Sequence, residues 1–230
     1  MSAFSSNGLS VVYSDLFNGV NIMRFINGSY QSYLQSNFDL VDHVSSLYPK
    51  VFAVRVDLRL FDGISVSDNS VMTRFIESLK AQIEADYLSK RKEAQSVVHK
   101  SDVFYIWVRE QGQDGKVHFH VCLFLNGNAY SSLGSFELGR NNLYNRIHKA
   151  WASALQKLCY WQESLDVDDV HGTIHFPLNG RYRLNRNEEG AEQQFEKLLY
   201  RLSYFAKVDT KYYGSRVRHY GCSRIPPKPA

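Results

Sequence analysis

Alternating apolar and charged residues mark the strand that anchors the expected fold. Between Val51 and Leu60, apolar side chains at every second position alternate with Arg55, Asp57 and Arg59. Successive side chains on a strand point to opposite faces, so one face should be buried while the other carries the three charged groups. That charged face fits either a solvated sheet surface or the border of a functional site.

Two further strands are predicted on either side of a short turn. Residues Val103–Glu110 and Val117–Phe124 are rich in β-branched and aromatic side chains, which favour strands. A three-residue loop with Gly115 in a left-handed conformation would place Glu110 opposite His118. A two-residue turn would instead shift the register and move Glu110 to the other face.

Segments with the periodicity of helices lie between and beside these strands. Apolar residues recurring every three to four positions predict one or two helices between Phe17 and Leu47, and one each over residues 67–95, 141–160 and 188–207. A short strand is expected over residues 170–176 and a polar loop over 177–187. The element order predicts an α+β fold, in which helices flank a central antiparallel sheet of about five strands. We expect a helical N-terminal extension over residues 1–48, a main domain over 49–210 and a basic tail over 211–230.

Composition narrows the class of protein. The chain has 230 residues, of which 44% are hydrophobic and 22% charged, so it should fold around a substantial core. Its net charge of +4 permits a polyanionic partner. The three cysteines are widely spaced and form no CxxC pair, which favours a reducing cytoplasm. The sequence shows neither a signal peptide nor an apolar run long enough to cross a membrane, so no membrane association is expected.

Candidate metal ligands lie on the predicted hairpin. His118 and His120 share one strand face, and Glu110 joins them in the three-residue-loop register. Two imidazoles and a carboxylate suit a divalent ion such as Mg²⁺ or Mn²⁺. His171 and His175 form a competing pair, although four residues along a strand separate them by roughly 13 Å.

The last predicted helix carries candidate catalytic groups. Tyr200, Tyr204 and Lys207 lie away from its apolar face, which offers two phenols and an ammonium group. The tail that follows interleaves tyrosines with basic residues, including Lys211, Arg216 and Arg218. This composition suits a single nucleic-acid strand, through phosphate contacts and base stacking, and it equally suits a solvated tail.

Three motifs in this order carry a family resemblance. His118-Phe119-His120 resembles the His-hydrophobic-His motif of the HUH endonucleases, which include rolling-circle replication initiators and relaxases. Tyr204 with Lys207 three residues later resembles their nucleophile motif. The segment from Arg55 to Arg59 resembles the first-strand motif of the inovirus gene II and YagK/YfjJ-type proteins.

The resemblance implies a ferredoxin-like or RRM-like HUH fold and a reaction in which a tyrosine cleaves DNA. His118, His120 and Glu110 would hold the metal, and Tyr204 would attack a DNA phosphate, leaving a 5′-phosphotyrosine and a free 3′-OH. Tyr200 would be a second nucleophile in a two-tyrosine mechanism, but Ser203 stands where some two-tyrosine members carry a second lysine.

The resemblance also implies partners. Single-stranded or locally melted origin DNA would bind along the sheet face and the tail, through Arg55, Arg59, Lys211, Arg216 and Arg218. No Walker-type motif occurs, so a host helicase would separate the strands. The setting would be the cytoplasm of a bacterium hosting a phage, prophage or plasmid. Two rival interpretations are a catalytically silent DNA-binding regulator of the same fold and a ferredoxin-like RNA-binding module.

Overall fold

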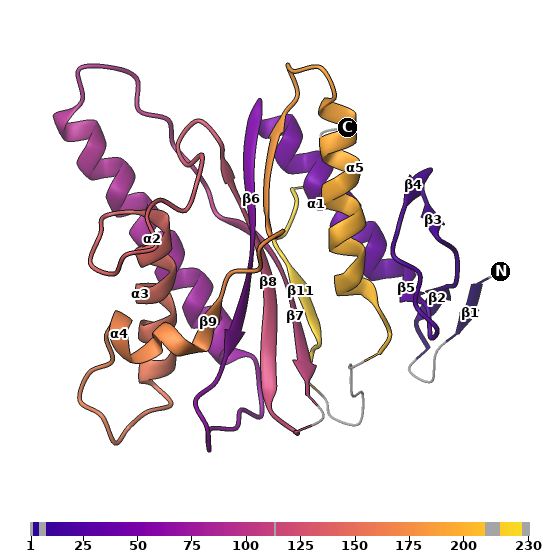
Figure 1. Cartoon of the computed structure of the whole chain (residues 1–230), viewed down its shortest axis with the longest axis horizontal. Coiled ribbons are helices and arrows are strands. Elements are labelled where there is room, and N and C mark those ends of the chain that lie inside the picture. The colour runs from indigo at the N-terminus through magenta and orange to yellow at the C-terminus, as the bar shows by residue number, and fades with distance from the viewer. Residues whose placement is uncertain (1, 5–7, 113, 210–216, 227–230) are drawn as a thin grey trace.

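A six-stranded antiparallel sheet forms the centre of the molecule (Figure 1). The computed structural model describes residues 2–4, 8–112, 114–209 and 217–226. Across the sheet the strands are β10 (Arg181–Asn185), β6 (Lys50–Arg59), β8 (Val117–Asn126), β7 (Phe104–Gln111) and β11 (Tyr220–Cys222), and β9 (Ile174–His175) pairs with β6. The predicted α+β class is confirmed, with six strands in the sheet rather than about five.

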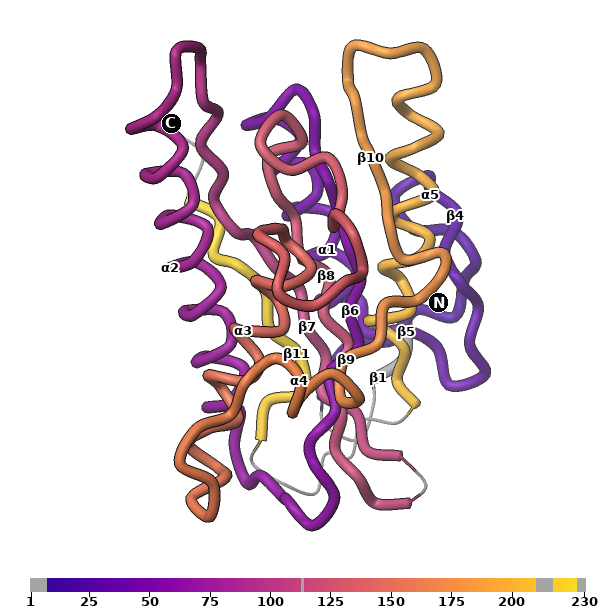
Figure 2. The backbone as a smooth tube through the Cα atoms, turned by 60° about the vertical axis from the view of Figure 1, so that its left-hand side comes forward, coloured from indigo at the N-terminus to yellow at the C-terminus, as the bar shows by residue number. Residues whose placement is uncertain are grey.

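Helices cover both faces of the sheet. The helices α2 (Ser70–Glu93) and α3 (Leu143–Gln156) pack on one face, and α1 (Gln31–Leu47) and α5 (Ala191–Ser203) pack on the other (Figure 1). Figure 2 shows β10, the strand at one edge of the sheet, beside α5, with α2 on the opposite side of the view. Three short helical turns complete the chain: α4 (Val167–Val170), η1 (His171–Thr173) and η2 (Tyr204–Ala206).

Because side chains alternate between the two faces of β6, this strand packs against both helical layers. Phe52, Val54, Val56 and Leu58 are each at most 1% exposed and pack in the α2–α3 layer. Burying each such side chain contributes about 1.5–3 kcal/mol. On the opposite face the first part of β6 packs under α1 and α5, whereas its last part carries the three charged residues.

The N-terminal region differs from its prediction. Only residues 31–47 are helical, as α1, and short strands precede it: β1 (Ser2–Phe4), β2 (Ser10–Val12), β3 (Leu16–Phe17), β4 (Val20–Asn21) and β5 (Ser29–Tyr30). The helix expected to start near Phe17 is wrong because Asn18 and Gly19 both have positive φ angles, of 50° and 79°. This Asn-Gly pair turns β3 back onto β4, as in a tight hairpin.

Three C-terminal predictions also need correction. The strand expected over residues 170–176 is reduced to Ile174 and His175, because α4 and η1 occupy the residues before them. The polar loop expected over 177–187 contains β10, whose pairing with β6 outweighs its polar composition. Within the expected tail, β11 pairs with β7 and extends the sheet.

One hydrophobic cluster joins the two ends of the chain to the sheet. Side chains of α1, such as Leu34 and Val41, pack with Leu198 of α5 and with Tyr220 of β11. The cluster therefore crosses both boundaries that the sequence placed, at residues 48 and 210. No helix within the described ranges is both long and apolar enough to span a membrane.

Candidate metal and nucleophile site

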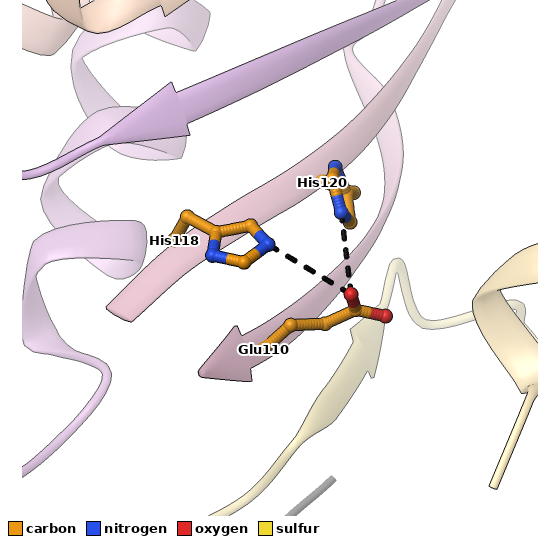
Figure 3. A group of neighbouring side chains, drawn as sticks. All are labelled: Glu110, His118 and His120. Carbon is orange, nitrogen blue, oxygen red and sulfur yellow. Dashed lines mark ion pairs between the residues drawn. The ribbon is translucent and has the colours of Figure 1, made fainter. Parts of the chain in front are cut away.

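The β7–β8 hairpin brings three candidate ligands together (Figure 3). Glu110 lies directly opposite His118 in the ladder, which confirms the register predicted for a left-handed Gly115 (φ 75°). Glu110 Oε2 is 3.8 Å from His118 Nε2 and 3.4 Å from His120 Nε2. One ligand atom from each residue falls within 4.8 Å of the others. Within the described ranges this is the only group of three or more such residues close enough to share an ion.

Glu110 has the properties of a metal ligand. Its side chain is 3% exposed, and its Oε1 is buried without a hydrogen-bond partner among the described residues. Burial raises the pKa of the carboxyl, but hydrogen bonds from His118 and His120 and the charge of Lys207 hold the pKa below its usual range. An ionised, partly unsatisfied carboxylate beside two imidazole nitrogens fits a divalent cation.

Asp57 and Arg55 support His120 from the neighbouring strand. Asp57 is the cross-strand partner of His120, and its Oδ1 lies 2.7 Å from His120 Nδ1. Arg55 donates to the same carboxylate from Nε at 2.9 Å and from Nη2 at 3.2 Å. Burial raises the pKa of Asp57, but its hydrogen bonds to His120 and Arg55 outweigh burial and lower the pKa to about 2.

The chain places Tyr204 and Lys207 over this cluster, at the end of α5. The helix ends at Ser203, and the η2 turn carries Tyr204. Lys207 Nζ donates to the Tyr204 hydroxyl oxygen at 2.6 Å and lies 3.3 Å from Glu110 Oε2. The Tyr204 ring contacts the His120 ring, with centroids 5.7 Å apart. Tyr204 and Lys207 therefore belong to the same cluster as the three candidate ligands.

Tyr200 is placed differently from Tyr204. It lies one turn earlier on α5 and is 45% exposed. Its carbonyl oxygen accepts a hydrogen bond from the Ser203 hydroxyl at 2.6 Å. The hydrogen bond from Lys207 goes to Tyr204, so Tyr204, rather than Tyr200, lies in the cluster of candidate ligands.

A cleft of about 590 Å³ opens beside the two histidines. Its walls come from the residues after β6, the β7–β8 turn and η1, and they include Arg59, Phe61 and Lys116. Arg59 is exposed and lies opposite His118 in the ladder. Lys116 pairs with Asp62 at 2.5 Å. The cleft thus offers charged and apolar surface within reach of the candidate ligands.

The expected DNA-binding residues that the structure describes differ in exposure. Arg59 and Arg218 are exposed, whereas the Arg55 side chain is only 13% exposed and is paired with Asp57. Lys211 and Arg216 lie outside the described residues.

The competing metal pair is not assembled. His171 lies in η1, and its ring faces that of His148 at 5.7 Å. His175 lies in β9, where its Nδ1 is 3.7 Å from Asp57 Oδ2. The expectation that His171 and His175 share a strand face is wrong, because the 3₁₀ turn of η1 replaces the first half of that strand.

Asp57 is the site residue that the sequence interpretation did not single out. Its signal was the alternation along β6, which placed it on the charged face between Arg55 and Arg59. Its role depends on facing His120, and only the pairing of β6 with β8 shows this contact.

One protein family and one relative match almost the whole length of the chain. The YagK/YfjJ C-terminal domain family matches residues 12–223. The chain is 36% identical to the uncharacterized protein YagK of Escherichia coli K12 over 216 residues, which cover 90% of this chain and 95% of YagK. It is also 36% identical to the uncharacterized protein YfjJ of the same strain over 159 residues, covering 68% of this chain and 72% of YfjJ. No solved structure matches the chain. The chain belongs to the YagK/YfjJ C-terminal domain family.

Proposed function

We propose that the protein is a metal-dependent, site-specific nickase of single-stranded DNA that acts through a 5′-phosphotyrosine intermediate. One observation supports this proposal above all others. A phenol, the ammonium group that binds it and a three-residue cluster of metal-ligand type meet at one point, because Lys207 contacts both Tyr204 and Glu110. The resemblance of His118-Phe119-His120 and of Tyr204 with Lys207 to HUH endonuclease motifs agrees with this reading.

Tyr204 supplies the nucleophile in this proposal. Its hydroxyl loses a proton to solvent as the oxygen forms a bond to the phosphorus of a DNA phosphodiester. The bond from phosphorus to the 3′ oxygen breaks, and that oxygen takes up a proton from solvent. The products are DNA joined to Tyr204 through its 5′ phosphate and a strand ending in a free 3′-OH. Attack by that 3′-OH reverses the step, so the enzyme both nicks and rejoins DNA.

Lys207 and the ligand cluster prepare the reaction. The Lys207 ammonium, 2.6 Å from the Tyr204 hydroxyl oxygen, would stabilise negative charge that develops during the attack. Glu110, His118 and His120 would hold Mg²⁺ or Mn²⁺. When bound, the ion would supply Lewis-acid stabilisation of negative charge on the phosphate.

A biological role follows from the products. The free 3′-OH can prime DNA synthesis, so we propose initiation of rolling-circle replication of a phage, prophage or plasmid. Strand separation would then come from a host helicase. With one phenol in the cluster, we propose that Tyr204 alone forms the intermediate.

The test is formation of a covalent protein–DNA adduct. Purified protein is mixed with a labelled single-stranded library and Mn²⁺, with and without EDTA, as the wild type, Tyr204→Phe and Tyr200→Phe. We expect a metal-dependent adduct that only Tyr204→Phe abolishes. Loss only in Tyr200→Phe would assign the wrong phenol, and DNA binding without any adduct would identify a silent DNA-binding regulator.

A further inference from the structure

Arg55 and Asp57 form a partly buried pair beside the candidate ligands. They lie two residues apart on β6, so both side chains point to the face that carries the site. Their side chains are 13% and 14% exposed. Arg55 donates from Nε and from Nη2 to the two Asp57 oxygens, and this two-point contact fixes both side chains.

The Asp57 contact determines which His120 nitrogen carries a proton. A carboxylate can only accept, so at 2.7 Å from Asp57 Oδ1 the Nδ1 of His120 must donate. Arg55 Nη2 is 3.0 Å from the same nitrogen. A guanidinium only donates, so this longer contact favours an unprotonated Nδ1, and the shorter contact to the Asp57 carboxylate outweighs it. In the neutral ring, Nε2 then keeps its lone pair, and this atom faces Glu110 at 3.4 Å.

Arg55 also contacts the ring of Tyr204. Its guanidinium carbon is 5.2 Å from the centre of the Tyr204 ring and 5.8 Å from that of Phe205. These distances suit attraction between a cation and an aromatic face. One guanidinium thus contacts both the carboxylate that orients His120 and the ring of Tyr204.

We propose that Arg55 and Asp57 are positioning residues that fix His120 for metal binding and align Tyr204 with it. Asp57 holds His120 in the tautomer whose Nε2 can bind a cation. Arg55 holds Asp57 in place and borders the Tyr204 ring. The inference rests on the proposed function, because metal binding and attack by Tyr204 are what the two residues would assist. It also gives Arg55 a role other than the DNA contact expected from the sequence.

Two measurements test the role of Asp57 without using nicking activity. The first is Mn²⁺ binding to the full chain by calorimetry, and the second is the His120 tautomer from ¹⁵N NMR of the metal-free protein. We expect Asp57→Ala to weaken Mn²⁺ binding by about 10- to 100-fold and to remove the hydrogen from Nδ1 in favour of Nε2. Arg55→Lys, which loses the two-point contact, should weaken binding by less than Asp57→Ala does.

Asp62→Asn is the matched control. Asp62 is an exposed carboxylate on the same cleft, paired with Lys116, so its loss removes equal charge but no contact to His120. Its Mn²⁺ affinity should change less than about twofold. Thermal unfolding checks that each variant folds, and Asp57→Leu, which is close in side-chain volume but has no acceptor oxygen, replaces Asp57→Ala if the latter does not fold.

The outcomes separate the inference from the proposed function. Unchanged tautomer and unchanged Mn²⁺ affinity in the Asp57 variants would overturn the inference, even if the wild type binds Mn²⁺ and forms the adduct. A wild type that binds no Mn²⁺ would overturn the proposed function. The tautomer measurement would still decide whether Asp57 orients His120.

Discussion

The ammonium group of Lys207 contacts both the Tyr204 phenol and the candidate metal ligand Glu110. Its Nζ is 2.6 Å from the Tyr204 hydroxyl oxygen and 3.3 Å from Glu110 Oε2, and the residue is 7% exposed. A buried cation between a carboxylate and a phenol stabilises negative charge on both groups. The position of this one atom links the Tyr204 phenol to the candidate ligands.

Replacing Lys207 by methionine should slow adduct formation more than it changes DNA binding. The variant removes a charge-assisted hydrogen bond worth about 1.5–3 kcal/mol, so the single-turnover rate should fall by about 10- to 100-fold. Lys197→Met removes an exposed lysine from α5 and serves as the control. Equal rates in the two variants would contradict the role given to Lys207.

Protonation of the His120 imidazole should make metal binding depend on pH. Burial lowers the pKa of its imidazole, but hydrogen bonds to Asp57 and Glu110 raise the pKa above its ordinary value. Below this raised pKa a proton occupies the nitrogen that a metal needs, so Mn²⁺ affinity should fall as the pH falls. The limit for one displaced proton is about tenfold per pH unit, and affinity should level off above the pKa. Calorimetry from about pH 6 to pH 8.5 measures this slope, and a constant affinity across the range would contradict competition by His120.

At the scale of elements, Asn37 connects three parts of the fold. From α1 it donates through Nδ2 to the Leu202 carbonyl of α5 at 3.0 Å, and it accepts from the Tyr220 hydroxyl of β11 at 2.9 Å. Asn37 is 1% exposed, so these bonds are shielded from water. They hold the end of α5, from which Tyr204 follows, against the helix and strand beside it.

Asn37→Leu should destabilise the fold by about 2–4 kcal/mol, because it leaves two buried polar groups without partners. Urea unfolding measures the change in the free energy of unfolding. Gln35→Leu, at an exposed position of the same helix, should change it by less than about 0.5 kcal/mol. The same small change in both variants would show that the buried bonds contribute little.

Strong local patterns made some elements predictable from the sequence. The alternation along β6 predicted the charged face, whereas the turn containing Gly115 left two registers open, of which the structure shows the one that pairs Glu110 with His118. The short strands β10 and β11 were missed, and β9 was expected to be longer, because segments of two to five polar or mixed residues carry no clear periodicity. Their pairing with β6 and β7 determines their conformation. Asp57 could not be assigned for the same reason, since its partner lies on another strand.

At the scale of the whole molecule, the sheet separates a stabilising layer from the layer that carries the site. Arg55, Asp57, His118 and His120 share their sheet face with α1 and α5, whereas α2 and α3 cover the other face. Phe75 of α2 is fully buried in that second layer, where its ring contacts Trp151 at 5.9 Å between centroids. The arrangement lets stability and site chemistry vary separately.

Phe75→Ala should therefore cost stability without changing the site. We expect the free energy of unfolding to fall by about 3–5 kcal/mol, while the Mn²⁺ affinity of the folded protein changes less than about twofold, since distant sites act independently. Urea unfolding and calorimetry under native conditions measure the two quantities. A loss of Mn²⁺ affinity as large as that of Asp57→Ala would mean that the layers are coupled.

The most direct measurement identifies the residue that becomes linked to DNA. Trypsin cleaves after Lys197, Arg201 and Lys207, so Tyr200 and Tyr204 fall in separate peptides, 198–201 and 202–207. The adduct formed with Mn²⁺ is digested with trypsin and nuclease and analysed by mass spectrometry. We predict a nucleotide attached through its 5′ phosphate to Tyr204 in peptide 202–207. A nucleotide on peptide 198–201, or no modified peptide from DNA-bound protein, would contradict the assignment of Tyr204 as the nucleophile of a nickase.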